Sequence, residues 1–179
     1  MISSVLPEVE TDEGDEGKMT NASKSPLTDI MPAMLLHEGK WSGIYRHVDA
    51  GNREIEQHRA MIECVFPATG PYAYVQKNHF VWDDGREYRA TLNGVLRDGK
   101  LWWDTDTFDG CGWESDFGLI LLNLNRKDEP GTRFYEIICM GDDGNHRART
   151  WHWFRNGRLI RRTLCDEQRV LPVSEATVD

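Results

Sequence analysis

Two side chains that can move protons follow Trp41 at strand-like spacing. Tyr45 and His47 are each separated from this tryptophan by an even number of residues. Because side chains at i and i+2 of a strand point to the same side, both share the face of Trp41. The imidazole pKa lies near neutrality, so a histidine there can act as general acid or base. The pattern predicts Tyr45 and His47 as catalytic candidates.

His152 is a third candidate for proton transfer. It lies between Trp151 and Trp153, so alternation puts both tryptophans on one strand face and His152 on the other. We expect the His152 face to line the interior, because its other residues are mostly small or apolar and leave room for a substrate. The alternative is a core histidine that bonds to a neighbouring strand.

Glu136 is an isolated carboxylate among apolar neighbours in the run Phe134–Ile138. If it faces inward, desolvation raises its pKa and makes it a candidate acid or base. If the strand faces the other way, Glu136 is solvated and Tyr135 is inside. The sequence leaves both orientations open.

Further polar and aromatic side chains are candidates for holding a substrate. Lys77 is best placed in solvent. Because side chains alternate along a strand, Tyr74, Asn78 and Phe80 then point inward. A guanidinium group can hold a carboxylate or a developing negative charge. The predicted substrate-binding residues are His58, Tyr74, Asn78, Phe80, Trp103, Arg149 and Arg161.

This inferred lining favours a ligand cavity over a filled core. A structural core would hold mainly Val, Ile and Leu, whereas polar side chains in an interior cost free energy unless they are satisfied. No metal site and no cofactor are predicted, because the sequence has no His-x-His or His-Glu-x-x-His spacing, phosphate loop or dinucleotide fingerprint. A metal site assembled from separate strands is not readable from spacing.

Regular turn signals follow residue 39 and define the elements that position these residues. Asn93-Gly94, Asp98-Gly99 and Asn156-Gly157 are typical of tight hairpins, and similar clusters recur along the chain. About ten antiparallel strands are therefore expected, and closure into an up-and-down barrel removes exposed edges. The sequence predicts an all-β barrel with a short N-terminal helix, and a two-sheet sandwich is the alternative.

Composition bounds the domain plan and the partners. We expect a disordered acidic tail over 1–27, one barrel domain over 28–170 and a flexible tail over 171–179. A net charge of -9 argues against nucleic acid and anionic membranes as partners. The chain shows no export signal or apolar span, so a soluble, cytoplasmic protein with reduced cysteines is predicted.

The motif Gly39-Lys40-Trp41 after a short apolar segment, the strand pattern and the late arginines Arg161 and Arg162 together resemble the calycin superfamily. Within it, the pattern is similar to a lipocalin-like bacterial family of unknown function. The resemblance implies that Trp41 faces inward, with an arginine of the last strand packed over it. Calycin-like barrels include cofactor-independent enzymes such as the phenolic acid decarboxylases.

The leading functional hypothesis is a cofactor-independent lyase, decarboxylase or isomerase acting on a small aromatic or apolar molecule. The alternative is a non-catalytic binding protein for a hydrophobic metabolite, a chromophore or haem. A homodimer formed through exposed tryptophans is a further hypothesis.

Overall fold

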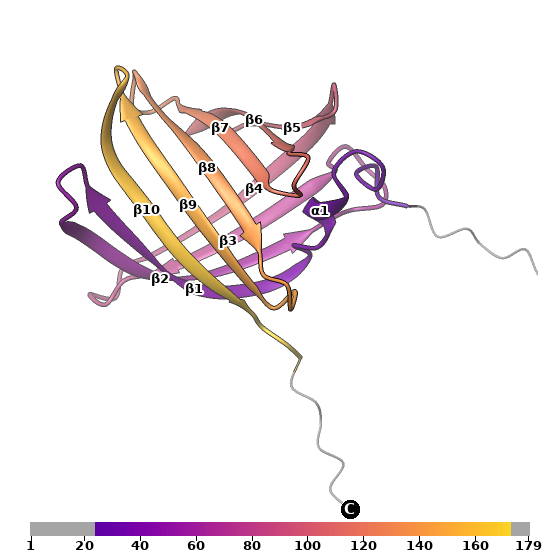
Figure 1. Ribbon diagram of the computed structural model, residues 1–179, viewed down its shortest axis with the longest axis horizontal. Coiled ribbons are helices and arrows are strands. Elements are labelled where there is room, and N and C mark those ends of the chain that lie inside the picture. Colours follow the sequence, from indigo (N-terminus) through magenta and orange to yellow (C-terminus); the bar gives the residue numbers. More distant parts are fainter. Residues whose placement is uncertain (1–23, 173–179) are drawn as a thin grey trace, which may run out of the picture.

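The computed structural model describes residues 24–172, which form one short helix and a closed barrel of ten strands (Figure 1). Every strand pairs antiparallel with its sequence neighbours, and the first pairs with the last. The predicted fold class is confirmed. The elements are α1 (Pro32–Leu35), β1 (Gly39–Asp49), β2 (Glu54–Val65), β3 (Tyr74–Val81), β4 (Glu87–Arg97), β5 (Lys100–Asp104), β6 (Phe108–Glu114), β7 (Ile120–Arg126), β8 (Thr132–Met140), β9 (His146–Arg155) and β10 (Arg158–Arg169).

The tightest turns follow the predicted chemistry. Asp98 and Gly99 connect β4 to β5 with φ values of 51° and 71°, and Asn156 and Gly157 connect β9 to β10 with 48° and 77°. Two successive residues with positive φ match the twist of flanking antiparallel strands. These dipeptides therefore set the register of two hairpins. The predicted turn at Asn93-Gly94 is wrong, because both residues lie inside β4 and pair with β3.

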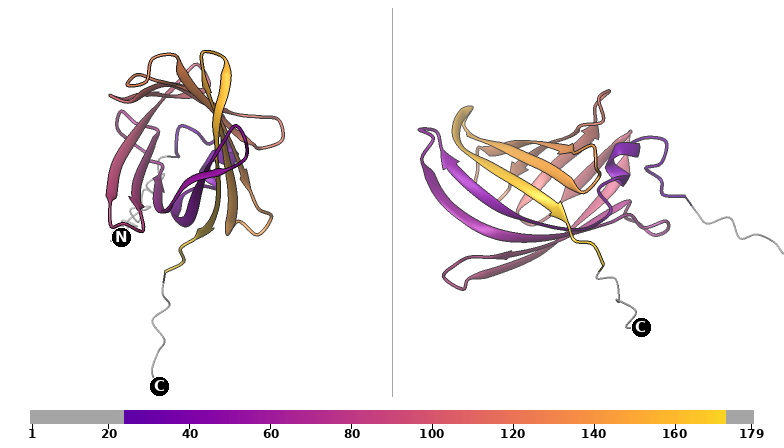
Figure 2. Two further views of the ribbon diagram at one scale, coloured as in Figure 1. Left: turned by 90° about the vertical axis from the view of Figure 1, so that its left-hand side faces the viewer. Right: turned by 60° about the horizontal axis from the view of Figure 1, so that its bottom comes forward.

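The N-terminal segment closes one end of the barrel, where α1 lies against the ends of the strands (Figures 1 and 2). Leu27, Met31 and Met34 are buried there. Glu114 on β6 accepts a hydrogen bond from the backbone N–H of Ala33 at 2.8 Å, which ties the helix to the barrel. None of the helical structure in residues 24–172 is long and apolar enough to cross a membrane.

The predicted tails fall mostly outside the described residues, so their disorder stays a prediction. Residues 1–23 and 173–179 are not described, and of the second predicted tail only 171 and 172 are. Leu27, at the end of the first predicted tail, is fully buried.

Trp41 is buried between two arginines at the closed end. The guanidinium carbons of Arg147 on β9 and Arg169 on β10 each lie 4.3 Å from the centre of its ring. Arg169 also donates hydrogen bonds to the backbone oxygens of Leu36, Glu38 and Gly144. An arginine of the last strand does cover Trp41, as the resemblance implied.

The prediction that Arg161 or Arg162 covers Trp41 is wrong. In the β1–β10 ladder Trp41 pairs with Arg169, whereas Arg161 pairs with Asp49 at the opposite end of β1. The antiparallel direction of β10 thus puts its last arginine, and not its first ones, beside the tryptophan.

Candidate functional site

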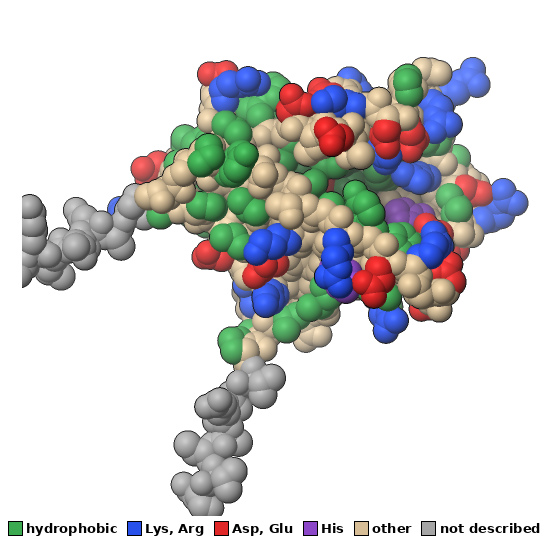
Figure 3. Space-filling view, turned by 180° about the vertical axis from the view of Figure 1, so that it is seen from behind, with side chains coloured by type: hydrophobic (Ala, Val, Ile, Leu, Met, Phe, Trp, Pro, Cys, Tyr) green, Lys and Arg blue, Asp and Glu red, His purple; other side chains and the backbone are tan. Residues whose placement is uncertain are grey.

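A cavity of about 570 Å³ lies inside the barrel, and no residue of α1 is among those that line it. Strands from all parts of the chain contribute to its wall, because inward side chains alternate along each of them. Figure 3 shows one face of the molecule, with a hollow in which histidine side chains are visible and charged side chains lie around it. Besides Tyr45, eight aromatic residues form much of the wall: Phe80, Trp82, Tyr88, Trp103, Phe108, Phe134, Trp151 and Trp153.

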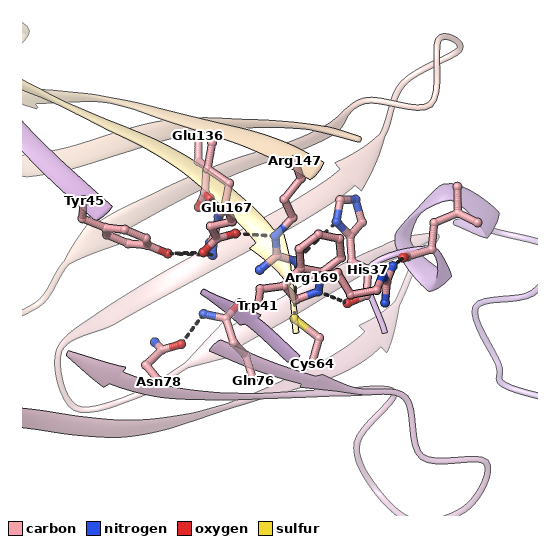
Figure 4. Close-up of polar contacts among 12 residues, drawn as sticks. His37, Trp41, Tyr45, Cys64, Gln76, Asn78, Glu136, Arg147, Glu167 and Arg169 are labelled. Carbon is pink, nitrogen blue, oxygen red and sulfur yellow. Dashed lines mark hydrogen bonds and ion pairs between the residues drawn. The ribbon is translucent and has the colours of Figure 1, made fainter. Parts of the chain in front are cut away.

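The floor of the cavity is a buried network of charged groups (Figure 4). Arg149 on β9 donates from Nε to Glu136 Oε1 at 2.6 Å and from Nη1 to the Tyr45 hydroxyl at 3.0 Å. The Tyr45 hydroxyl donates in turn to Glu167 Oε1 at 3.0 Å. Arg147 donates from Nε to the other oxygen of Glu167. Two guanidinium groups therefore face two carboxylates in the middle of the barrel.

The network balances its own charge. Burial alone would lower the pKa of Arg149, but the carboxylates of Glu136 and Glu167 outweigh it and raise the pKa above its ordinary value. Burial raises the pKa of Glu136, and Arg149 opposes that rise. Burial also raises the pKa of Tyr45 well above its ordinary value. At neutral pH the tyrosine is therefore a hydroxyl that is already bonded on both sides.

A second polar chain runs along β3 beside the floor. The Tyr74 hydroxyl donates to Gln76 Oε1 at 2.8 Å, and Gln76 Nε2 donates to Asn78 Oδ1 at 2.7 Å. The hydrogen bonds all run in one direction, because the side-chain oxygens of Gln76 and Asn78 each accept from the preceding member of the chain. It leaves the Asn78 amide nitrogen as a donor on the cavity wall.

Two histidines lie near the open end of the cavity. His58 on β2 is buried among aromatic rings, and neither of its ring nitrogens has a hydrogen-bond partner within the described part of the chain. His47 on β1 bonds through Nδ1 to Thr163 Oγ1 at 2.8 Å. Burial lowers the pKa of both rings, for His47 to about 4, so they are neutral at pH 7. Neutral imidazole can accept a proton or coordinate a metal.

The structure brings most of the predicted site residues to this cavity. Tyr45 and His47 share the face of Trp41, and Glu136 takes the inward of its two possible orientations. Whether any of them acts on a ligand stays a prediction. The predicted residues that line the cavity are Tyr45, His47, His58, Asn78, Phe80, Trp103, Glu136 and Arg149.

The predicted interior position of His152 is wrong. In β9 the buried residues are Arg147, Arg149, Trp151 and Trp153, so His152 lies on the outer face. It pairs with Tyr135 of β8, which is 41% exposed. The small side chains of β9 lie on the outer face, because the cavity is large enough to take the tryptophans and arginines of that strand.

Two predicted binding residues lie outside the cavity wall. Tyr74 is buried on the α1 side, where its hydroxyl contacts Cys64 Sγ at 3.2 Å and donates a hydrogen bond to Gln76 Oε1. Arg161 packs over Trp153, with its guanidinium carbon 4.2 Å from the ring centre. Neither is among the residues that line the cavity.

The sequence analysis missed Glu167, Arg147, Glu56 and Trp82. Glu167 and Arg147 are buried charges, and each lies among other charged residues in the sequence, a pattern typical of solvated strand faces. Glu167 could have been found by alternation along β10, because it shares a strand face with Thr163 and Cys165. Glu56 joins His47 only through the β1–β2 register, which turn spacing does not give.

No protein-family model matches the chain, and no curated protein matches its sequence. Solved structures are similar in fold. The S-type phycobiliprotein lyase CPES from Guillardia theta shares 14% identity at a TM-score of 0.63, over 78% of this chain and 91% of that one. Rv2717c from M. tuberculosis shares 15% identity at a TM-score of 0.56, over 79% and 98%.

A protein of unknown function from the DUF3598 family of Nostoc punctiforme has a TM-score of 0.58 at 14% identity over 76% of this chain. This chain spans only about half of that protein, 49% of its length. At such identities the likeness is one of fold alone, that of a closed antiparallel barrel, and membership of the calycin superfamily stays a prediction. Membership of one particular bacterial family stays a prediction.

Proposed function

We propose that this protein binds a small, largely aromatic molecule in the barrel cavity. The observation that carries the proposal is the contrast between a self-satisfied polar floor and an aromatic wall around about 570 Å³ of space. Ligand pockets of this size are lined mainly by apolar side chains, with a few placed polar groups. The amide nitrogen of Asn78 and the ring nitrogens of His58 supply such groups.

Binding is favoured over the proton-transfer roles first predicted for Tyr45 and Glu136. The Tyr45 hydroxyl already donates to Glu167 and accepts from Arg149. Arg149 is held by Glu136 and is not a free cation for a substrate carboxylate. A group whose hydrogen bonds are all made inside the protein supports the shape of a pocket more readily than it exchanges protons with a ligand.

A fluorescence titration tests the proposal, with 8-anilinonaphthalene-1-sulfonate as the probe. The variant Ala90→Trp places a large ring in the cavity from β4, and we expect it to weaken probe binding at least ~10-fold, a loss of about 1.4 kcal/mol. The matched control is Thr91→Trp, because the next residue of the same strand is exposed on the outer face. Equal binding by both variants would contradict a cavity site.

A cofactor-independent lyase, decarboxylase or isomerase is the second candidate. It is favoured by His58, whose two ring nitrogens have no hydrogen-bond partner among residues 24–172 and lie on the cavity wall within reach of a bound molecule. The test is product formation from a panel of aromatic acids, followed by chromatography. Binding of an acid without product formation supports a non-catalytic binding protein. A separate absorption spectrum with added haemin distinguishes a haem ligand from other chromophores.

The solved neighbours bear on the ligand class only by analogy. One of them is a phycobiliprotein lyase, so a barrel of this fold serves a chromophore-bearing protein elsewhere. A homodimer stays a prediction: Trp82, Trp102 and Trp113 are half-buried, and the other four tryptophans are buried. Their rings pack inside the barrel or beneath long side chains.

A further inference from the structure

The β1–β2 register gathers three potential metal ligands near the open end of the cavity. Tyr45 pairs with His58, and two residues on, His47 pairs with Glu56. The ligand atoms of His47, Glu56 and His58 all lie within 4.8 Å of one another. Because the three residues alternate with outward-facing neighbours, their side chains point to the same side of the sheet.

His58 is the observation that calls for a ligand. Its side chain is buried, with only 7% of the residue exposed, and rings of Phe80 and Trp82 lie at centroid distances of 5.0 and 4.6 Å. Neither Nδ1 nor Nε2 has a hydrogen-bond partner among residues 24–172. A buried polar group without a partner costs about 1–3 kcal/mol, so a retained histidine in this state indicates a group that the protein itself does not supply.

His47 is held in an orientation suited to coordination. Thr163 Oγ1 accepts a hydrogen bond from Trp153 Nε1 at 2.9 Å and contacts His47 Nδ1 at 2.8 Å. With Nδ1 engaged, the other ring nitrogen, Nε2, is the one available for a metal ion. Metal-bound histidines in proteins are usually fixed through their second nitrogen in this way.

Glu56 completes the set from the rim. Its Oε1 accepts from Arg86 Nη2 at 3.1 Å in a partly exposed ion pair, and the second carboxylate oxygen is left for coordination. In a tetrahedral site with bonds of about 2.1 Å, neighbouring ligand atoms lie about 3.4 Å apart. Rotation of the rim glutamate can close the remaining gap without moving the buried histidine.

We propose that His47, His58 and Glu56 bind one divalent transition-metal ion, of which Zn²⁺ is the simplest example. Two imidazoles and one carboxylate are a common three-residue set for such ions, and three protein ligands leave a position for water or for another ligand. That position faces the cavity, so the ion would act as a Lewis acid on the polar end of a bound molecule. The site does not depend on the identity of the cavity ligand.

The test uses the full chain, stripped with a chelator and titrated with Zn²⁺ by calorimetry and with Co²⁺ by visible absorption. We expect one ion per chain. His58→Phe and Glu56→Gln should each weaken binding at least ~100-fold. Thr163→Val, which removes the contact to His47 Nδ1 and the acceptor for Trp153 Nε1, should weaken it about 10-fold or more. Glu56 lies at the partly exposed rim, so its variant reports on the site even if His58→Phe folds poorly.

The matched controls are His79→Gln and Glu87→Gln, which break another histidine–glutamate pair, 2.9 Å apart on the surface. They should leave stoichiometry and affinity unchanged. Absence of a 1:1 complex in the wild type, or equal weakening by the control variants, would overturn the proposal. Probe binding in the cavity is measured in parallel, so loss of metal binding alone is distinguishable from failure of the proposed function.

Discussion

His37 is the residue whose burial bears most directly on pH stability. It is 2% exposed, its backbone oxygen accepts from Trp41 Nε1 at 2.9 Å, and Arg147, Arg149 and Arg169 lie nearby. Burial first, and then these three cations, lower its pKa from 6.5 to about 3. The folded protein therefore keeps a neutral imidazole under conditions in which the unfolded chain would protonate it.

The sign of the pH effect follows from this depressed pKa. Below pH 6.5 the unfolded state binds a proton at His37 that the folded state does not, so folding stability is lost as pH falls from 6.5 towards 3. For each pH unit below 6.5, the free energy of unfolding falls by up to about 1.4 kcal/mol, which amounts to about 3 kcal/mol at pH 4.5. His37 Nδ1 lies 3.4 Å from Arg147 Nη1, and the variant His37→Asn keeps an acceptor for this arginine but cannot titrate.

Urea unfolding at pH 7 and pH 4.5 checks this prediction. The wild type should lose about 3 kcal/mol more than His37→Asn between the two pH values. Other titrating groups are common to both proteins and cancel in the comparison. An equal loss in the two proteins would show that His37 is protonated in the folded state.

At this scale the sequence predicts inward faces well where a marker is present. Trp41 fixed the phase of β1, and Lys77 fixed that of β3, so Tyr45, His47, Asn78 and Phe80 are on the cavity wall as predicted. In β9 no such marker exists, because both faces carry large or polar side chains. The choice between Trp151 and His152 depended on the size of the interior, which is a property of the closed barrel.

Among the elements, β6 contains a glycine, Gly110, that lies very close to the backbone of β7. Gly110 has a φ of 145°, and an added Cβ would lie 2.2 Å from the backbone oxygen of Asn123 on β7. Real Cβ atoms do not approach backbone oxygens this closely, so any side chain here forces the two strands apart.

We expect Gly110→Ala to destabilise the barrel by more than ~3 kcal/mol, since strained backbone and a steric clash act together. The control is Gly144→Ala in the β8–β9 turn, where φ is also positive at 66° but nothing lies within 4 Å of an added Cβ. That change should cost only about 1 kcal/mol of backbone strain. Thermal and urea unfolding compare the two, and similar losses would mean that β6 and β7 can move apart.

Elements were easier to predict than contacts between them. Asn-Gly and Asp-Gly pairs marked several hairpins, and closure followed from the need to remove sheet edges. The Gly110 contact and the pairing of His47 with Glu56 are set by strand register. Turn spacing alone does not give register, so neither was predicted.

Across the whole molecule, the charged layer separates the part sealed by α1 from the open cavity. Arg147, Arg149, Glu136 and Glu167 come from three strands and sum to zero charge. Removing one partner of a buried ion pair typically costs 3–5 kcal/mol, because the other charge is left uncompensated.

A double-mutant cycle on Arg149→Met and Glu136→Gln tests this balance. Each single change should cost about 3–5 kcal/mol in urea unfolding, and the double variant should lose less than the sum, because it removes both charges together. Arg46→Met and Asp166→Asn provide the surface comparison, where the ion pair spans 3.9 Å and is exposed. Additive losses in the buried pair would contradict the coupling.

The pairing of Trp41 with Arg169 joins the first strand to the last, so the barrel closes only at the end of synthesis. Nine ladders join strands that are adjacent in the chain, but the tenth joins β1 to β10 and has the longest loop to close. A growing chain on the ribosome can form hairpins one after another, yet both free edges persist until β10 emerges. High contact order therefore makes the final ladder the slow step, and chaperone protection is most valuable just before it forms.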